Sequence, residues 1–216
     1  MTCKTLDYTI AISKEELAEF PRVEYYGSVK IVDTKAEMVR AIKILKKYDI
    51  LGFDTESRPT FKKGATIHVS LIQIAADDIC FLFRIRKIED ISPLRELIDD
   101  PNILKIGLSL RDDFNMLSHD YNFKPQGFID LQKLVVKYKF SSCSLQKIYA
   151  ILFNQRITKR QQLSNWNAPT LTEAQMHYAA IDAWACIQIY KKLEIEGFDP
   201  DMSKYKVYKT EEDEEI

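Results

Sequence analysis

Several features that mark special classes of protein are scarce or missing in this sequence. The chain of 216 residues has only 6 Gly and 7 Pro, which excludes collagen-like and low-complexity proteins. No apolar run reaches the roughly 18 residues of a membrane span, and the acidic N-terminal stretch does not fit a secretory signal. No CxxC pair occurs among the four cysteines, Cys3, Cys80, Cys143 and Cys186. We therefore expect a cytoplasmic protein with reduced thiols and no membrane partner.

Strong net charge is also absent, at −1 for 31 basic and 32 acidic residues, but this average hides an uneven distribution. Residues 121–165 carry eight Lys or Arg against one acid, and residues 58–88 carry six against two. The last 23 residues carry nine acids against three Lys. Two interpretations are open: solvated faces with a disordered tail, or phosphate-binding surfaces beside a group of carboxylates.

Hydrophobic patterning predicts alternating strands and helices. Short β-branched or apolar runs predict strands over 29–32, 50–54, 66–75, 79–83, 103–107 and 128–130. Helical spacing and capping residues predict helices after Asp33 or Thr34, Ser92, residue 109, Asp130, Ser144 and Thr172. The pair Asp77–Asp78 predicts a hairpin, whereas most other connections contain helices. The pattern favours one α/β domain with a mixed sheet over 29–197, between an N-terminal extension, 1–28, and an acidic C-terminal tail, 198–216.

The most informative acids end the apolar strand ILGFD. Residues i and i+2 of a strand point the same way, so Asp54 and Glu56 present two carboxylates side by side. Like charges at short range raise each other's pKa, and a divalent cation with a preference for oxygen ligands, such as Mg²⁺ or Mn²⁺, removes that cost. The alternative is a polar turn that leaves the strand.

Further acids lie on helices. Asp112 and Asp113 open a helix, where acids also interact favourably with the helix dipole. Asp182 lies in the apolar stretch AAIDAWACI, and a carboxylate there needs a partner. Tyr178 precedes Asp182 by four residues and shares its helical face.

These motifs resemble, in order and spacing, the three exonuclease motifs of the DEDDy branch of the DnaQ-like superfamily. The stretch from Ser164 to Ala183 is especially similar to Werner-syndrome-type 3′–5′ exonuclease domains and their bacterial relatives. The resemblance implies a ribonuclease-H-like fold, with a mixed five- to six-stranded β-sheet flanked by α-helices. It also implies 3′–5′ hydrolysis of phosphodiester bonds with two divalent cations, Mg²⁺ or Mn²⁺. By resemblance the metal ligands are Asp54, Glu56, Asp113 and Asp182, and Tyr178 orients the attacking water.

Two residues compete with those assignments. Asp112 is an alternative second-motif acid, but the spacing from Lys105 and to Leu117 favours Asp113. His177 is an alternative to Tyr178, because the sister DEDDh branch uses a His before its last Asp. On a helix His177 lies about 140° from Asp182, whereas Tyr178 lies only about 40° away, which favours Tyr178.

Nucleic acid is the expected partner, and no protein partner is indicated. Candidate substrate contacts are Thr55, Lys62, Lys63, Lys159, Arg160 and Trp166. Trp166 has two interpretations, because it could stack on a base or belong to the core. The leading interpretation is a metal-dependent 3′–5′ exonuclease that acts on DNA and releases 5′-mononucleotides. The alternatives are a ribonuclease D-like 3′–5′ exoribonuclease and a catalytically silent nucleic-acid-binding module.

Overall fold

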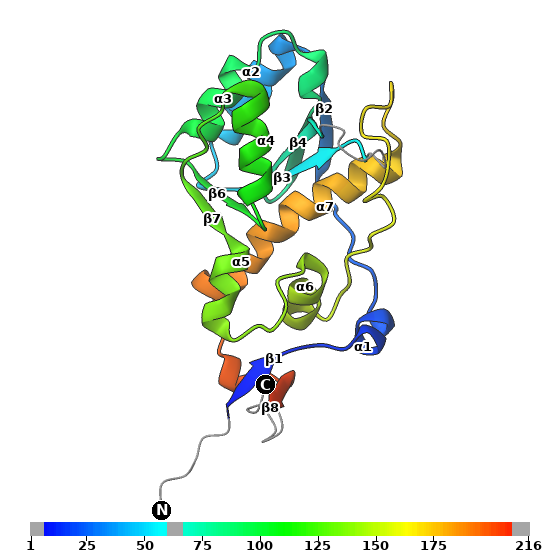
Figure 1. Cartoon of the computed structure of the whole chain (residues 1–216), viewed down its shortest axis with the longest axis vertical. Coiled ribbons are helices and arrows are strands. Elements are labelled where there is room, and N and C mark those ends of the chain that lie inside the picture. Colours follow the sequence, from blue (N-terminus) through cyan, green and yellow to red (C-terminus); the bar gives the residue numbers. More distant parts are fainter. Residues whose placement is uncertain (1–6, 60–66, 209–216) are drawn as a thin grey trace, which may run out of the picture.

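The computed structural model describes residues 7–59 and 67–208. Its centre is a six-stranded sheet with the strand order β2 (Ser28–Val32), β5 (Ile79–Phe83), β4 (Val69–Ala75), β3 (Ile50–Ser57), β6 (Leu104–Gly107) and β7 (Phe128–Asp130) (Figure 1). β5, β4 and β3 pair in antiparallel fashion, whereas β2, β6 and β7 join the sheet in parallel. All of β4 is buried, as expected for a strand covered on both faces. The predicted mixed sheet is confirmed.

Helices cover both faces of this sheet (Figure 1). One hydrophobic cluster joins the sheet to α2 (Lys35–Leu45), α3 (Ser92–Asp99) and α4 (Arg111–Tyr121). Two further clusters join it to α5 (Leu131–Leu134), α6 (Leu145–Phe153) and α7 (Glu173–Tyr190). Shorter helical turns are η1 (Ile85–Lys87), η2 (Val135–Tyr138), η3 (Lys191–Ile195) and η4 (Pro200–Met202).

The predicted helix caps are present. Thr34 and Thr172 each accept a hydrogen bond from the third backbone N–H of the following helix, within complete capping boxes. Ser144 accepts from the N–H of Lys147 at the start of α6. These local bonds satisfy N–H groups that the helices leave free, which explains why α2, α6 and α7 begin at these residues.

A buried lysine connects α3 to the sheet. Lys105 of β6 is fully buried, and its ammonium group donates to the carbonyl oxygens of Leu97 at 3.1 Å and Asp100 at 2.8 Å. Both acceptors lie at the C-terminal end of α3, where carbonyls lack helical partners. Burial lowers the pKa of Lys105 to about 8.

The segments on either side of residues 29–197 meet each other. β1 (Tyr8–Ile10) pairs antiparallel with β8 (Lys206–Tyr208), and α1 (Lys14–Glu19) follows β1. Ile10 and Val23 are buried in the cluster that contains α5, α6 and α7. The described parts of the predicted extension and tail are therefore packed against the sheet-and-helix unit (Figure 1).

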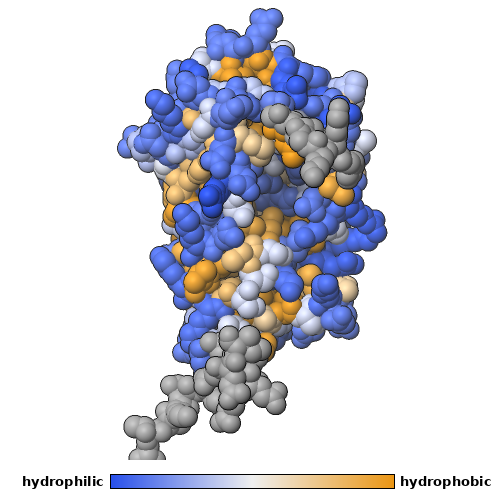
Figure 2. All heavy atoms as spheres, viewed as in Figure 1, coloured by the Kyte–Doolittle hydropathy of each residue, from blue (hydrophilic) through white to orange (hydrophobic). Residues whose placement is uncertain are grey.

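No helix among the described residues has the length and apolar character needed to cross a bilayer. The face shown in Figure 2 is largely polar and is hollowed across its middle, between the regions of α4 and α6 in the same view.

Candidate active site

A close contact between two backbones brings the site together. A Cβ atom on Gly52 of β3 would lie only 2.0 Å from the carbonyl oxygen of Ala183 on α7. Only glycine therefore permits α7 to cross β3 at this distance. Asp54 lies two residues further along β3, on the same face, and Asp182 immediately precedes Ala183. The glycine thus places the first and third acidic motifs next to each other.

Three of the predicted ligands form a compact cluster. Asp54, Glu56 and Asp182 each offer a carboxylate oxygen, and these three atoms lie within 4.8 Å of one another. Asp182 is only 5% exposed, and its Oδ1 atom is buried without a hydrogen-bond partner among the described residues. A buried, unpartnered carboxylate oxygen is costly unless a cation binds it.

The pKa values of the three carboxyl groups also indicate a cation site. Burial, followed by the charges of Asp182 and Glu56, raises the pKa of Asp54 well above its ordinary value. Burial and the charge of Asp182 raise the pKa of Glu56 to about 9. Burial raises the pKa of Asp182 to about 7, against the opposing effects of the nearby Tyr178 hydroxyl and Lys159. The three groups repel one another as anions, and a divalent cation would offset that repulsion. The donor set, all carboxylate oxygen, fits Mg²⁺ or Mn²⁺.

Asp113 lies close to this cluster, but its carboxylate is not one of the three whose oxygens lie within 4.8 Å of one another. It accepts a hydrogen bond from the Thr55 hydroxyl, and burial raises its pKa to about 6. Its charge in turn raises the pKa of both Asp54 and Glu56. Asp112 is exposed, so Asp113 is the acid of this helix that the fold turns towards the cluster.

An aspartate outside the three predicted motifs fixes the start of α4. The carboxylate of Asp130, at the end of β7, accepts the N–H groups of Ser109 at 2.8 Å and Leu110 at 3.3 Å. Ser109 has a left-handed backbone, with φ of 61°. Asp130 thereby holds the turn from which Asp113 projects. The sequence shows Asp130 only as an acid at the end of a predicted strand, which does not indicate this role.

Tyr178 and His177 occupy different surroundings. Tyr178 is 8% exposed and lies one helical turn before Asp182. Burial and the charges of Asp182 and Glu56 raise its pKa, so its hydroxyl stays protonated at neutral pH and serves as a donor. His177 is exposed, and its ring lies 3.8 Å from the carboxylate of Glu173. Of these two residues, Tyr178 lines the pocket that contains the acids and His177 does not.

That pocket has a volume of about 280 Å³. Asp54, Glu56 and Asp182 line it together with Thr55, Lys159 and Tyr178. Residues that the motifs did not indicate complete the wall: Leu108, Ser144, Leu145, Gln146, Gln162 and Cys186. Ser144 was identifiable as a helix cap, but nothing in the sequence connects the start of α6 with β3, since only the tertiary fold brings them together.

The remaining predicted substrate contacts have different outcomes. Lys159 lines the pocket, whereas Arg160 lines a neighbouring one. Lys62 and Lys63 lie outside the described residues. The prediction that Trp166 stacks on a base is wrong for this structure, because the side chain is only 1% exposed and packs against the Tyr178 ring at 6.0 Å. Its core interpretation is the one that holds.

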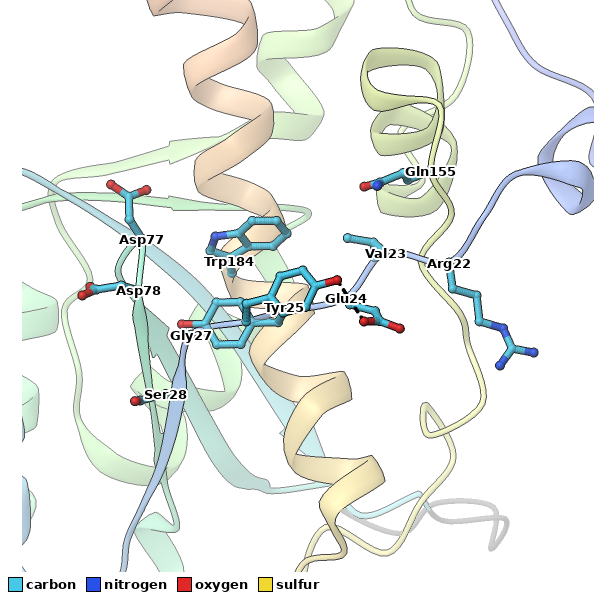
Figure 3. A pocket seen from close by; sticks show the side chains of 11 residues that line it. Arg22, Val23, Glu24, Tyr25, Gly27, Ser28, Asp77, Asp78, Gln155 and Trp184 are labelled. Carbon is cyan, nitrogen blue, oxygen red and sulfur yellow. Dashed lines mark hydrogen bonds between the residues drawn. The ribbon is translucent and has the colours of Figure 1, made fainter.

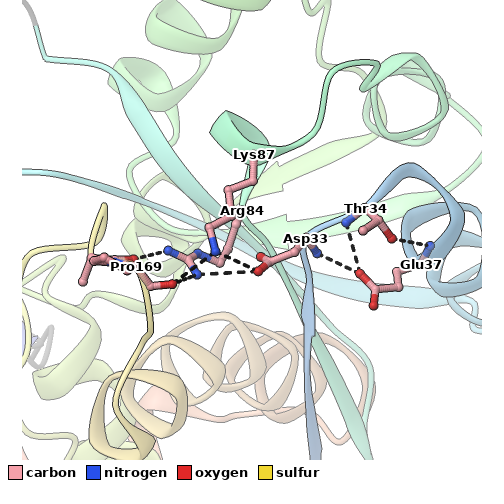
Figure 4. A network of polar contacts seen from close by, with 7 residues as sticks. Asp33, Thr34, Glu37, Arg84, Lys87 and Pro169 are labelled. Carbon is pink, nitrogen blue, oxygen red and sulfur yellow. Dashed lines mark hydrogen bonds and ion pairs between the residues drawn. The ribbon is translucent and has the colours of Figure 1, made fainter.

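A polar network holds the connection that carries Lys159 and Trp166 (Figure 4). The Arg84 guanidinium donates to the carbonyl oxygens of Pro169, at 2.8 Å, and Ala168. Arg84 lies 3.6 Å from the Asp33 carboxylate, and Lys87 bridges the same carboxylate and Pro169. The connection between α6 and α7 is thus fastened to the β2–β5 edge of the sheet.

A larger cavity, of about 690 Å³, lies between the segment that leads into β2, the β4–β5 turn and α7 (Figure 3). Residues 22–28, Asp77, Asp78 and Trp184 line it. Its two aspartates already have partners, because Lys191 binds Asp77 at 2.7 Å and the Tyr48 hydroxyl donates to Asp78. Unlike the carboxylate cluster, this cavity presents no unbalanced group of acids among the described residues.

The fold and the carboxylate cluster define a nuclease domain of the ribonuclease-H-like kind, and comparison with known proteins agrees. Residues 29–197 match the family described as 3′–5′ exonuclease, and the chain belongs to that family. It is 32% identical over 176 residues to exonuclease 3′-5′ domain-containing protein 2 of Drosophila melanogaster, covering 80% of this chain and 30% of the relative. It is 29% identical over 212 residues to a 3′-5′ exonuclease of Arabidopsis thaliana, covering 89% and 73%.

Solved structures support the same fold. The crystal structure of Escherichia coli RNase D superposes with a TM-score of 0.72 and 24% identity, over 79% of this chain and 45% of that chain. The chain therefore spans less than half the length of RNase D and about a third of the Drosophila relative. The predicted family and the ribonuclease-H-like fold are confirmed.

Proposed function

We propose that this chain is a metal-dependent 3′–5′ exonuclease that releases 5′-mononucleotides from DNA. The observation that carries the proposal is the cluster of Asp54, Glu56 and Asp182, with three carboxylate oxygens within 4.8 Å of one another and an unpartnered buried oxygen on Asp182. Buried like charges in this arrangement destabilise the fold unless they serve a ligand. The family to which the chain belongs supplies the reaction class.

Asp54, Glu56 and Asp182 would hold the metal, with Asp113 as the fourth predicted ligand. When two divalent cations are bound, such a site supplies an activated water and positive charge for the scissile phosphate. The residues of the chain then have separate tasks. The protonated Tyr178 hydroxyl can orient the attacking water by hydrogen bonding. Thr55 holds the Asp113 carboxylate in place.

Lys159 provides positive charge at the pocket wall. It is exposed, lines the same pocket as the acids and lowers the pKa of Asp182. A cation at this position can attract the phosphate backbone of the substrate. The pocket volume, about 280 Å³, is near the lower limit of ligand pockets, roughly 300 Å³, which suits one terminal nucleotide.

An exoribonuclease of the ribonuclease D kind is the second candidate. Its support is the similarity in fold to RNase D of Escherichia coli, which is described as an exoribonuclease involved in structured RNA processing. DNA is favoured here by the likeness of residues 164–183 to Werner-type exonuclease domains.

The test uses 5′-labelled 3′-recessed duplex DNA and single-stranded RNA of matched sequence, with Mg²⁺, Mn²⁺ or EDTA. We expect a ladder of products shortened from the 3′ end of DNA, and no products with EDTA. Faster hydrolysis of RNA would favour the second candidate. Absence of nucleotide release from both substrates with either metal would refute both enzyme proposals, and retained binding would then indicate a silent binding module.

Neighbouring acids provide the matched control for this test. Asp113→Asn removes a predicted ligand and should abolish product formation. Asp112→Asn makes the same chemical change at an exposed neighbouring position and should retain activity. Equal loss in both variants would contradict the assignment of Asp113.

A further inference from the structure

The pocket that Arg160 lines, called here the second pocket, adjoins the pocket that contains Asp54, Glu56 and Asp182, called here the carboxylate pocket. Tyr178 lines both of them. The second pocket has a volume of about 160 Å³, and its polar lining includes Arg22, Arg160, Gln161 and His177. Ligand pockets that enclose a whole small molecule start at roughly 300 Å³. The second pocket is therefore too small for a nucleotide but has room for a single phosphate group.

Neither arginine of this pocket is neutralised by another described residue. Among the described residues, neither Arg22 nor Arg160 has a carboxylate within the 4.0 Å of an ion pair. His177 faces only the distant carboxylate of Glu173, at 3.8 Å. Two guanidinium groups without a carboxylate partner in the described part of the chain, beside the proposed phosphodiester site, provide the forked donors that phosphate oxygens prefer.

Arg22 belongs to the N-terminal segment, outside the residues matched by the exonuclease family. Its backbone is fixed from both sides: the N–H of Val23 donates to the Arg156 carbonyl at 3.1 Å, and the N–H of Arg156 donates to the Pro21 carbonyl at 2.9 Å. The Arg156 side chain also donates to the Phe20 carbonyl at 2.8 Å. Figure 3 shows the Arg22 side chain extending away from Tyr25 and Trp184. The segment therefore presents Arg22 from a held backbone.

We propose that Arg22 and Arg160 bind a backbone phosphate of the substrate strand, upstream of the scissile phosphodiester. The proposal rests on the proposed function, since it takes the carboxylate pocket as the place where the 3′-terminal nucleotide binds. Tyr178 separates the two pockets, so a strand whose terminal phosphodiester reaches the carboxylates passes this residue and brings an upstream phosphate to the arginines. The N-terminal segment thereby extends the substrate site of the exonuclease domain.

Binding is measured with a fluorescein-labelled single-stranded oligonucleotide. All proteins in this assay carry Asp182→Asn, so that the probe is not consumed. Arg22→Ala should weaken binding about 10-fold, the low end for a charge-assisted hydrogen bond. It should also reduce the slope of log affinity against log salt by about 0.7. Arg22→Lys should restore part of the affinity, because it keeps the charge without the fork.

Arg40→Ala is the matched control, because Arg40 is an exposed arginine of α2 with no ion pair among the described residues. It should bind like the parent protein. If Arg22→Ala binds like Arg40→Ala, or if the parent protein does not bind the oligonucleotide, the proposal is overturned. Equal thermal melting temperatures of the variants would show that the side chain, and not the fold, accounts for the difference.

A second substrate separates this proposal from the proposed function. The 4-nitrophenyl ester of thymidine 5′-monophosphate has one phosphodiester and no upstream phosphate. With native Asp182, Arg22→Ala should leave KM for this ester unchanged while KM for the oligonucleotide rises about 10-fold. A rise for both substrates would overturn the upstream assignment. If the native protein hydrolyses neither substrate but Arg22→Ala still weakens binding, the exonuclease proposal fails and the phosphate site stands.

Discussion

Replacing Gly52 with alanine tests whether the close approach of β3 and α7 builds the site. The new Cβ atom would lie 2.0 Å from the Ala183 carbonyl oxygen and 2.8 Å from its carbonyl carbon. Ordinary contacts begin near 3.4 Å, so the two elements must separate by about 1.4 Å. Both partners are backbone atoms, and no side-chain rotation can relieve the contact.

The substitution should reduce both the stability of the fold and the rate of the reaction. Overpacking of a buried site destabilises by about 1–3 kcal/mol, occasionally more, and a backbone–backbone clash belongs at the upper end. Asp54 and Asp182 lie next to the contact, so the separation also moves two predicted ligands apart. A misplacement of about 1 Å at a reacting centre can reduce the rate by roughly 100-fold. Gly52→Ala should therefore lose about 3 kcal/mol of stability and about 100-fold in kcat.

Denaturant unfolding measures the first quantity, and 3′-end hydrolysis at a temperature where the variant is folded measures the second. Gly197→Ala is the matched control, because Gly197 has φ of 82° but a Cβ atom added there would meet no atom within 4 Å. It should lose about 1–2 kcal/mol through backbone strain alone and keep its kcat. Native kcat in folded Gly52→Ala would refute the role of this contact in placing the acids.

The other predictions concern metal binding, the tyrosine and a buried charge. Mg²⁺ or Mn²⁺ at 100 times its Kd should stabilise the folded protein by about 2.7 kcal/mol, measured by thermal melting. Asp182→Asn should lose this stabilisation, and an unchanged stabilisation in the variant would contradict the assigned site. Tyr178 is proposed to orient the attacking water, and a misplacement of about 1 Å at a reacting centre costs roughly 100-fold, so Tyr178→Phe should reduce kcat by about 100-fold. His177→Ala should keep kcat near the native value, and the reverse order would contradict the choice of tyrosine. Folding lowers the pKa of Lys105 from 10.5 to about 8, so the unfolded chain binds more protons between these values and stability should rise with pH there. The difference in unfolding free energy between native protein and Lys105→Met should follow that rise between pH 8 and pH 10, and a flat difference would contradict it.

The parts of the fold that the sequence predicts correctly depend on local patterns. The hydrophobic periods placed the strands and helices, and the residues Thr34, Ser144 and Thr172 identified three helix starts through bonds within one turn. The side-by-side carboxylates of Asp54 and Glu56 followed from strand geometry alone. Each of these features depends on residues that are close in the sequence.

Features that depend on distant residues were not predictable. β1 and β8 are three-residue strands from opposite ends of the chain, and three residues show no period. Lys105 lies in a strand that reads as buried, but only the fold shows that its ammonium group reaches the end of α3. Trp166 gave two interpretations, and the packing against Tyr178 decided between them.

The near-zero net charge of the chain conceals a separation of charge at the site. The acids Asp54, Glu56 and Asp182 are concentrated in one pocket, and the cations Lys159 and Arg160 lie at its wall and in the adjoining pocket. Neither set neutralises the other by ion pairs among the described residues. In a fold without ligands this separation is unfavourable, because Lys159 lowers the pKa of Asp182 while the pKa values of Asp54 and Glu56 stay raised. A divalent cation on the acids and a nucleic-acid phosphate backbone on the bases would balance both at once, so the separation of charge fits the proposed metal-dependent reaction on nucleic acid better than it fits a role in folding stability.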